Sequence, residues 1–152
     1  MKKIYLCGPT LYSDIHIGNA RSIVLFDVIS EYYRRTQGVM YVRNITDVDD
    51  KIVNLAGDVN PADWVTANTL DGFSQAKRIL MTKDPDYEPR ASQYIPEIIS
   101  YVQNLERNGY AFLKEDGVYL DITKVDHPTK VSNRQRGSKE DSFAVWTLFN
   151  SG

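Results

Sequence analysis

The stretch from Lys3 to Ser22 places the strongest constraint on the fold of this chain. It opens with an apolar run that is typical of a buried strand, and Gly8-Pro9 ends this run. After a polar turn, a helical pattern begins at His16. Backbone N–H groups at the start of such a helix can bind an anion, so this strand, turn and helix favour a nucleotide site.

The helical pattern continues to about residue 37, where Gly38 is a typical stop signal after a basic last turn. Residues 39–44 then have the composition of a second short strand. Strand, helix and strand in this order form a βαβ unit, in which the two strands are parallel neighbours. The sequence therefore predicts an α/β fold with a parallel sheet.

The remaining segments alternate between helical and extended patterns. Thr46 and Asp47 are expected to cap a short helix, and a longer helix is expected from about residue 61 to 81. Two prolines keep the loop over residues 83–89 out of a helix. An amphipathic helix over residues 92–108 and a β-hairpin with an Asp-Gly turn over residues 110–122 follow. We expect a mobile polar loop at 124–142 and a last apolar strand or other short element at 143–149.

Composition narrows the class of protein. The 152 residues, 42% of them hydrophobic, suit one globular domain, and 20 acidic against 18 basic side chains argue against wholesale binding of polyanions. A single cysteine excludes an internal disulfide and a four-cysteine zinc site. The first apolar run is too short for a signal core or a membrane span, so we expect a cytoplasmic protein without a membrane partner.

The segment His16-Ile17-Gly18-Asn19 is the first candidate site. His16 can donate a hydrogen bond to a phosphate oxygen, most strongly when it is protonated. Gly18 has no side chain, so a base or a ribose can lie against the backbone there. The competing interpretation is a histidine that only caps the helix, and four residues alone do not decide between the two.

A second candidate is the acidic cluster Asp47, Asp49 and Asp50. Three carboxylates in four residues can hold Mg²⁺, but the periodicity alone favours the simpler interpretation that they stabilise the start of a helix. They follow the second strand, at the sheet edge where ligands bind in open α/β folds.

Two further features have plain structural interpretations. Cys7 lies among apolar residues, which is typical of a buried core cysteine, and its spacing from His16 and His127 is not that of a metal site. The basic residues of the late polar loop can contact phosphates or simply face solvent, namely Lys130, Arg134, Arg136 and Lys139.

Several motifs together resemble the cysteinyl-tRNA synthetase family, in the family's order and spacing and over essentially the whole chain. They include Cys7-Gly8-Pro9-Thr10-Leu11-Tyr12, His16-Ile17-Gly18-Asn19-Ala20-Arg21-Ser22, the run from Tyr41 to Ile52, Glu88-Pro89-Arg90-Ala91-Ser92, Gly117-Val118-Tyr119-Leu120-Asp121 and Phe143-Ala144-Val145-Trp146.

This resemblance implies a class I synthetase of nucleotidyl-transferase type. The implied fold is a Rossmann-like partial parallel sheet with flanking helices and a β-hairpin insertion. Residues 1 to about 90 would be the first Rossmann half of a single truncated catalytic domain, and residues 91–152 a helix, hairpin and connecting segment. The implied activity joins cysteine to ATP as cysteinyl-adenylate, with Mg²⁺, and then transfers it to tRNA.

The resemblance also assigns roles to individual residues. His16 and Asn19 would be catalytic and steady the ATP phosphates, and Tyr12 and Gly18 would complete the ATP site. Cys7 would be the family's first zinc ligand, with zinc holding the thiolate of the substrate. The amino-acid pocket would be lined by Gly8, Thr10, Asn44 and Thr46.

The sequence also departs from the family pattern. The segment His16-Ile17-Gly18-Asn19 stands where the family carries its HIGH signature, and Asn19 replaces the last histidine but still offers a hydrogen-bonding side chain. The KMSKS loop and the segments with the other zinc ligands do not occur in these 152 residues. We therefore expect activity to need a C-terminal half, or self-association to cover the open sheet. Two alternatives stay open: a catalytically deficient paralogue that binds adenosine nucleotide or a protein partner, and a ligase that joins cysteine to an acceptor such as an amino-sugar.

Overall fold

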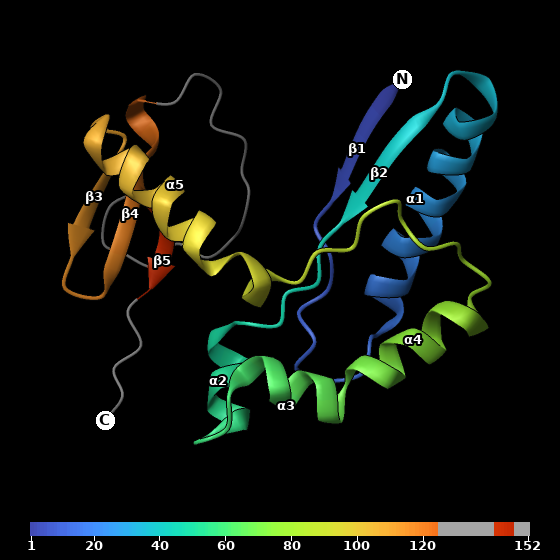
Figure 1. Ribbon diagram of the computed structural model, residues 1–152, viewed down its shortest axis with the longest axis horizontal. Coiled ribbons are helices and arrows are strands. Elements are labelled where there is room, and N and C mark those ends of the chain that lie inside the picture. The colour runs from blue at the N-terminus through green and yellow to red at the C-terminus, as the bar shows by residue number, and fades with distance from the viewer. Residues whose placement is uncertain (125–141, 148–152) are drawn as a thin grey trace. The chain divides into compact units, whose positions relative to one another are not determined.

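The structure is a computed structural model that describes residues 1–124 and 142–147, with side chains described up to residue 124. The chain forms two compact units, Met1–Tyr94 and Ile95–Gly152, and each is described by itself (Figure 1). In the described part of the chain, no helix combines the length and the apolar character that crossing a membrane requires.

The first unit is built on a parallel βαβ unit, as predicted. Strand β1 (Lys2–Leu6) pairs with β2 (Val39–Arg43) in parallel, and α1 (Ile17–Thr36) connects them (Figure 1). Gly38 follows the helix, and its N–H donates to the carbonyl oxygen of Tyr33 at 2.8 Å. The two strands end side by side, so the segments that follow them begin at the same edge of the sheet.

Residues 83–89 form no helix, as their two prolines predict, but the segment does more than connect. It runs parallel to β2, with bridges between Val42 and Tyr87 and between Ile45 and Arg90. The N–H of Arg43 donates to Tyr87 at 3.1 Å, and the N–H of Ile45 donates to Pro89 at 2.8 Å. Strand β2 therefore has an extended neighbour on both sides.

Three short helices follow β2: α2 (Asp50–Ala56), α3 (Pro61–Asn68) and α4 (Leu70–Ile79). The prediction of one helix from 61 to 81 is wrong, because the chain breaks at Thr69. The buried Thr69 hydroxyl donates to the carbonyl oxygen of Leu11 at 2.8 Å, which holds the break against the segment after β1. The helices close a core of buried apolar side chains: Leu11, Ile23, Ile45, Ile52, Val65 and Phe73.

The second unit contains the predicted amphipathic helix and hairpin. After the 3₁₀ turn η1 (Ala91–Tyr94) that closes the first unit, α5 (Ile95–Arg107) leads to the antiparallel sheet β3 (Ala111–Lys114), β4 (Gly117–Asp121) and β5 (Ser142–Thr147), with η2 (Ile122–Lys124) after β4. Val102, Ala111 and Val118 form its small core. The expected last strand is present as β5, whereas residues 125–141 of the expected mobile loop lie outside the described residues.

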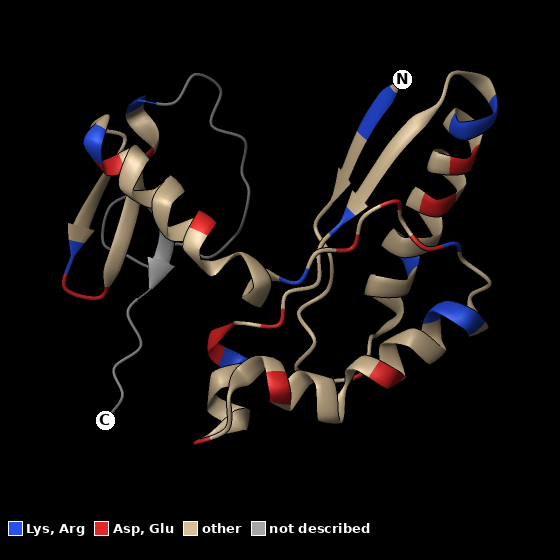
Figure 2. Ribbon diagram, viewed as in Figure 1, with Lys and Arg blue, Asp and Glu red and all other residues tan. Residues whose placement is uncertain are grey.

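Charged side chains at every second position fasten the extended segment 84–90 to the first unit. Figure 2 shows charges of both signs along it. Asp84 pairs with Lys77 at 2.7 Å, and Asp86 pairs with Arg34 at 3.0 Å. Glu88 and Arg90 continue the alternation and have buried partners.

The Asp86 carboxylate gives a pH-dependent contribution to stability. Hydrogen bonds from Arg34 and from the backbone N–H of Tyr41 hold the pKa of Asp86 below its usual value. The stabilisation is complete above the unfolded pKa of about 4 and is lost as the pH falls through the lower folded pKa. We expect the variant Asp86→Asn to lower the urea midpoint at neutral pH. The difference between the urea midpoints at neutral pH and at about pH 3 should therefore become smaller. An unchanged difference would contradict this, and Asp58→Asn, at an exposed carboxylate, is the control.

Candidate functional site

Asn44 joins the ends of the two parallel strands. Its Oδ1 accepts hydrogen bonds from the N–H of Gly8 at 2.8 Å and from the hydroxyl of Tyr5 at 3.0 Å, and its Nδ2 donates to Oγ1 of Thr46 at 3.1 Å. A parallel bridge joins Thr10 to Thr46. The structure therefore brings together all four residues that the family resemblance assigns to the amino-acid pocket, and their role in binding stays a prediction.

Gly8 lies against the backbone of Asn44. A β-carbon at position 8 would lie 1.5 Å from the carbonyl oxygen of Asn44 and 3.3 Å from Cγ of Arg43. Only glycine allows the two chain segments to approach this closely. The close contact fixes the turn after β1 against the segment after β2.

His16 and Asn19 form a reciprocal cap at the start of α1. The N–H of Gly18 donates to Nδ1 of His16 at 3.0 Å, and the N–H of His16 donates to Oδ1 of Asn19 at 3.3 Å. His16 therefore does cap the helix, as the structural interpretation predicts. Because Nδ1 accepts this hydrogen bond, Nε2 is the ring nitrogen that remains available to donate to a ligand.

Gly18 serves the imidazole of His16 directly. A β-carbon at position 18 would lie 2.8 Å from Cε1 and 2.9 Å from Nδ1 of that ring. The absence of a side chain therefore lets the histidine fold over the first turn of the helix. Close approach of a nucleotide at the same place stays a prediction.

A cavity of about 130 Å³ lies beside this cap, among residues of the turn and the start of α1. It contains three of the four residues predicted for ATP and one predicted for the amino acid, which places the two candidate subsites next to each other. Its volume suits a phosphate group better than a whole nucleotide. The lining residues are Thr10, Tyr12, Ser13, Asp14, Ile15, His16 and Asn19.

Asp47 has a different role from the helix cap that we predicted. It is fully buried, and its carboxylate accepts hydrogen bonds from Nε of Arg90 at 2.8 Å and from the N–H and hydroxyl of Ser92 at 2.9 and 2.6 Å. Asp49 caps α2 instead, accepting from the N–H of Lys51 at 3.0 Å. Asp47 therefore ties the segment after β2 to the chain around residue 90.

Cys7 is exposed at the end of β1, so the prediction of a buried core cysteine is wrong. Within residues 1–124 and 142–147, no three histidine, cysteine, aspartate or glutamate side chains gather closely enough to hold a metal ion. The described residues thus do not fit a zinc site by themselves, and Cys7 supplies one thiol. The basic residues from 130 to 139 lie outside the described part of the chain.

Sequence reasoning missed three contributors to this region: Tyr5, Asp14 and Arg90. Tyr5 was assigned only to a buried strand, yet its hydroxyl reaches Asn44. Arg90 donates a hydrogen bond to Asp47, and it is one of the alternating charged residues of segment 84–90. Charged residues at every second position are a pattern typical of a strand, so the sequence did contain a signal for an extended segment here.

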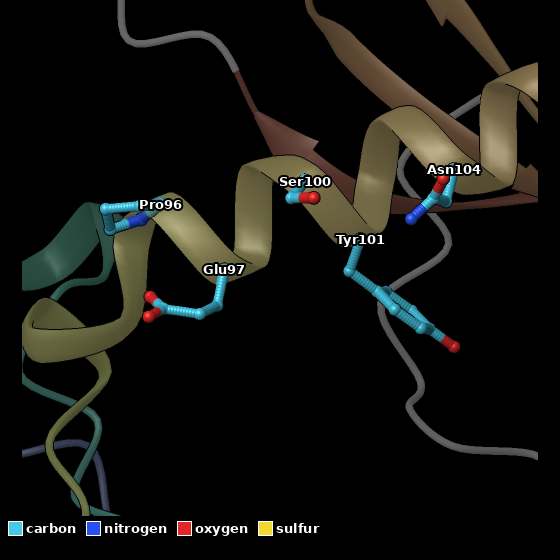
Figure 3. A pocket seen from close by; sticks show the side chains of 5 residues that line it. All are labelled: Pro96, Glu97, Ser100, Tyr101 and Asn104. Atoms are coloured by element: carbon cyan, nitrogen blue, oxygen red, sulfur yellow. The ribbon is translucent and has the colours of Figure 1, made fainter.

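A second, larger hollow of about 400 Å³ runs along α5 in the other unit. Its described lining consists of Pro96, Glu97, Ser100, Tyr101 and Asn104. Figure 3 shows that all five side chains come from one helix. A site that fixes a ligand needs polar groups converging from several elements, so this hollow is the weaker candidate.

Comparison with known proteins places the chain within a described family. The family described as "tRNA synthetases class I (C) catalytic domain" matches residues 1–145. A cysteine–tRNA ligase of Coxiella burnetii (strain Dugway 5J108-111) is 40% identical over 135 residues, covering 87% of this chain and 30% of the relative. One from Rickettsia bellii (strain OSU 85-389) is 36% identical over 156 residues, covering 98% of this chain and 33% of the relative.

The chain thus spans about a third of the length of these relatives. Among solved structures, the ternary complex of Agrobacterium radiobacter K84 agnB2 LeuRS, tRNA and LeuAMS is similar, with a TM-score of 0.54 and 20% identity. The match covers 80% of this chain and 16% of that one. This likeness supports the fold alone, a class I synthetase core of mixed α/β type.

Proposed function

This chain belongs to the class I tRNA synthetase (C) catalytic-domain family, and we propose that it is the ATP- and cysteine-binding part of a cysteine–tRNA ligase. The observation that carries the proposal is the cavity shared by His16, Asn19 and Thr10, because it joins the helix start to the strand ends. The relatives are named for ligation to tRNA, so neither a purely binding paralogue nor a ligase for an amino-sugar gains support from them.

In the proposed reaction a carboxylate oxygen of cysteine attacks the α-phosphorus of ATP. The bond between the α-phosphorus and the bridging oxygen breaks, and pyrophosphate leaves; Mg²⁺, if bound, would neutralise part of its charge. A hydroxyl at the tRNA 3′ end then attacks the carbonyl carbon, its proton goes to the departing phosphate, and AMP leaves. Nε2 of His16 and Nδ2 of Asn19 are donors held by the reciprocal cap, and such preorganised donors stabilise the charge that develops on phosphate.

The rest of the catalytic domain is proposed to cover two open surfaces of the first unit. Among the described strands β1 pairs only with β2, so its other edge has no strand neighbour. Helix α1 exposes large apolar side chains at Val24, Leu25, Val28 and Tyr32. Parallel sheets are normally covered on both faces, and the longer relatives have the chain length to do this. Self-association is the competing way to cover both surfaces.

The test of the proposed function is exchange of pyrophosphate into ATP. This chain is mixed with the remaining part of one of the cysteine–tRNA ligases, and each component is also assayed alone. We expect exchange that depends on cysteine in the mixture and in neither component alone. A mixture that forms a complex but gives no exchange would contradict the proposal. A stable dimer of this chain that excludes the added part would favour self-association.

His16 allows a sharper test, because its capping and ligand-binding roles can be separated. His16→Ser keeps a good N-cap but removes the ring donor, whereas His16→Ala removes both. We expect both variants to weaken ATP binding about tenfold, and only His16→Ala to lose about 1 kcal/mol of stability. Titration by NMR and urea unfolding measure the two effects. If His16→Ser bound ATP as the wild type does and only the destabilised His16→Ala bound it more weakly, His16 would be only a cap.

A further inference from the structure

Among the described residues, no lysine or arginine lines the cavity beside His16. The polar groups of this described lining are hydroxyl, amide and imidazole groups, and its one charged side chain is the carboxylate of Asp14. A phosphate-bearing ligand placed there would meet a negative charge. Nearby positive charge is therefore needed if an anion is to bind well.

Lys51, on α2, is in a position to supply this charge. Its Nζ lies 4.3 Å from the centre of the Tyr12 ring, and Tyr12 lines the cavity. The lysine is exposed. Cation–π attraction favours this placement over the ring face while the ammonium keeps its hydrogen-bond donors.

The Tyr12 ring beneath that lysine is held in place by packing. The ring is partly buried and packs against the core cluster around Leu11 and Ile52. Ile52 follows Lys51 directly on α2 and is itself fully buried, so the helix that carries the lysine is anchored in the same core. The helix turn that carries Lys51 and the Tyr12 wall of the cavity therefore pack on the same cluster.

We propose that Lys51 is a phosphate-binding residue of the cavity beside His16, and that the Tyr12 ring positions it. The ammonium donates to a phosphate oxygen and offsets the charge of Asp14. The identity of the ligand as a nucleotide rests on the proposed function, but the inference itself concerns any oligophosphate. Lys51→Arg is expected to keep the interaction, because the guanidinium also stacks on aromatic rings and binds phosphate.

The experiment titrates the full chain with inorganic triphosphate, ATP and adenosine, followed by NMR. We expect Lys51→Met to weaken triphosphate and ATP about tenfold and to leave any adenosine binding unchanged. Lys51→Arg should bind as the wild type does. The control is Lys114→Met, since Lys114 also lies over an aromatic ring, 4.4 Å from Tyr119, but lines no part of this cavity. It should bind as the wild type.

The three ligands separate the inference from the proposed function. Lysine-dependent triphosphate binding without any binding of ATP would support the Lys51 site and contradict the nucleotide proposal. ATP binding that Lys51→Met leaves intact would overturn the inference and spare the proposed function. If the wild type binds neither triphosphate nor ATP, the inference and the proposed function are both overturned.

Discussion

The substitution Gly8→Ala is expected to disrupt the first unit and to abolish ligand binding at the strand ends. The new β-carbon would overlap the carbonyl oxygen of Asn44, at 1.5 Å, and its carbonyl carbon, at 2.7 Å. Both atoms belong to backbone, so a rotamer change cannot relieve the overlap. Overpacking usually costs about 1–3 kcal/mol, and an overlap with backbone at this distance should reach or exceed the upper figure.

The same change should also break the hydrogen bonds that organise the candidate site. The two segments would have to separate, which removes the bond from the Gly8 N–H to Asn44 and pulls Asn44 from Thr46. Urea unfolding and an NMR titration with cysteine measure the two consequences. Gly57→Ala is the control, because Gly57 has a positive φ of 56° but no atom within 4 Å of a β-carbon. The unfavourable backbone conformation alone should cost about 1–3 kcal/mol, which is less than the overlap at Gly8. Equal losses in the two variants would contradict the steric argument.

Local patterns were sufficient to predict the βαβ unit, the helix α5 and the hairpin. In each case a residue's neighbours in sequence carry the signal, as with the apolar spacing of α5 or the turn before Gly117. The family motifs likewise predicted which residues meet at the strand ends. These predictions succeed because each of those segments adopts in the fold the conformation that its local sequence favours.

The errors arose where distant segments decide the outcome. Thr69 breaks a helix because Leu11, far away in sequence, offers a carbonyl oxygen. Asp47 has the sequence context of a helix cap, but Arg90 and Ser92 bind its carboxylate in the interior. No window around either residue contains its partner. Such positions can be predicted only after the tertiary arrangement is known.

The buried ion pair between Arg43 and Glu88 gives the second large effect. Arg43 is 0% exposed, and its Nε donates to Glu88 at 2.9 Å with a second bond from Nη2. The guanidinium also lies 5.6 Å from the centre of the Phe73 ring, deep in the unit. Glu88→Ala would leave this charge buried without its counter-charge. We expect a loss of about 3–5 kcal/mol, since breaking one side of a buried pair costs that much.

Urea unfolding measures this loss, and Glu31→Ala is the matched control. Glu88 pairs with two cations, Arg43 and Lys77. Glu31 likewise pairs with Arg35 and Lys83, but those pairs are exposed, so its removal should change stability little. The double variant Arg43→Met with Glu88→Leu should recover most of the stability lost in Glu88→Ala, because well-packed apolar groups can replace a buried pair. If the double variant were as unstable as Glu88→Ala, the cost would come from lost packing of the segment 84–90. Recovery would instead identify the uncompensated guanidinium as its cause.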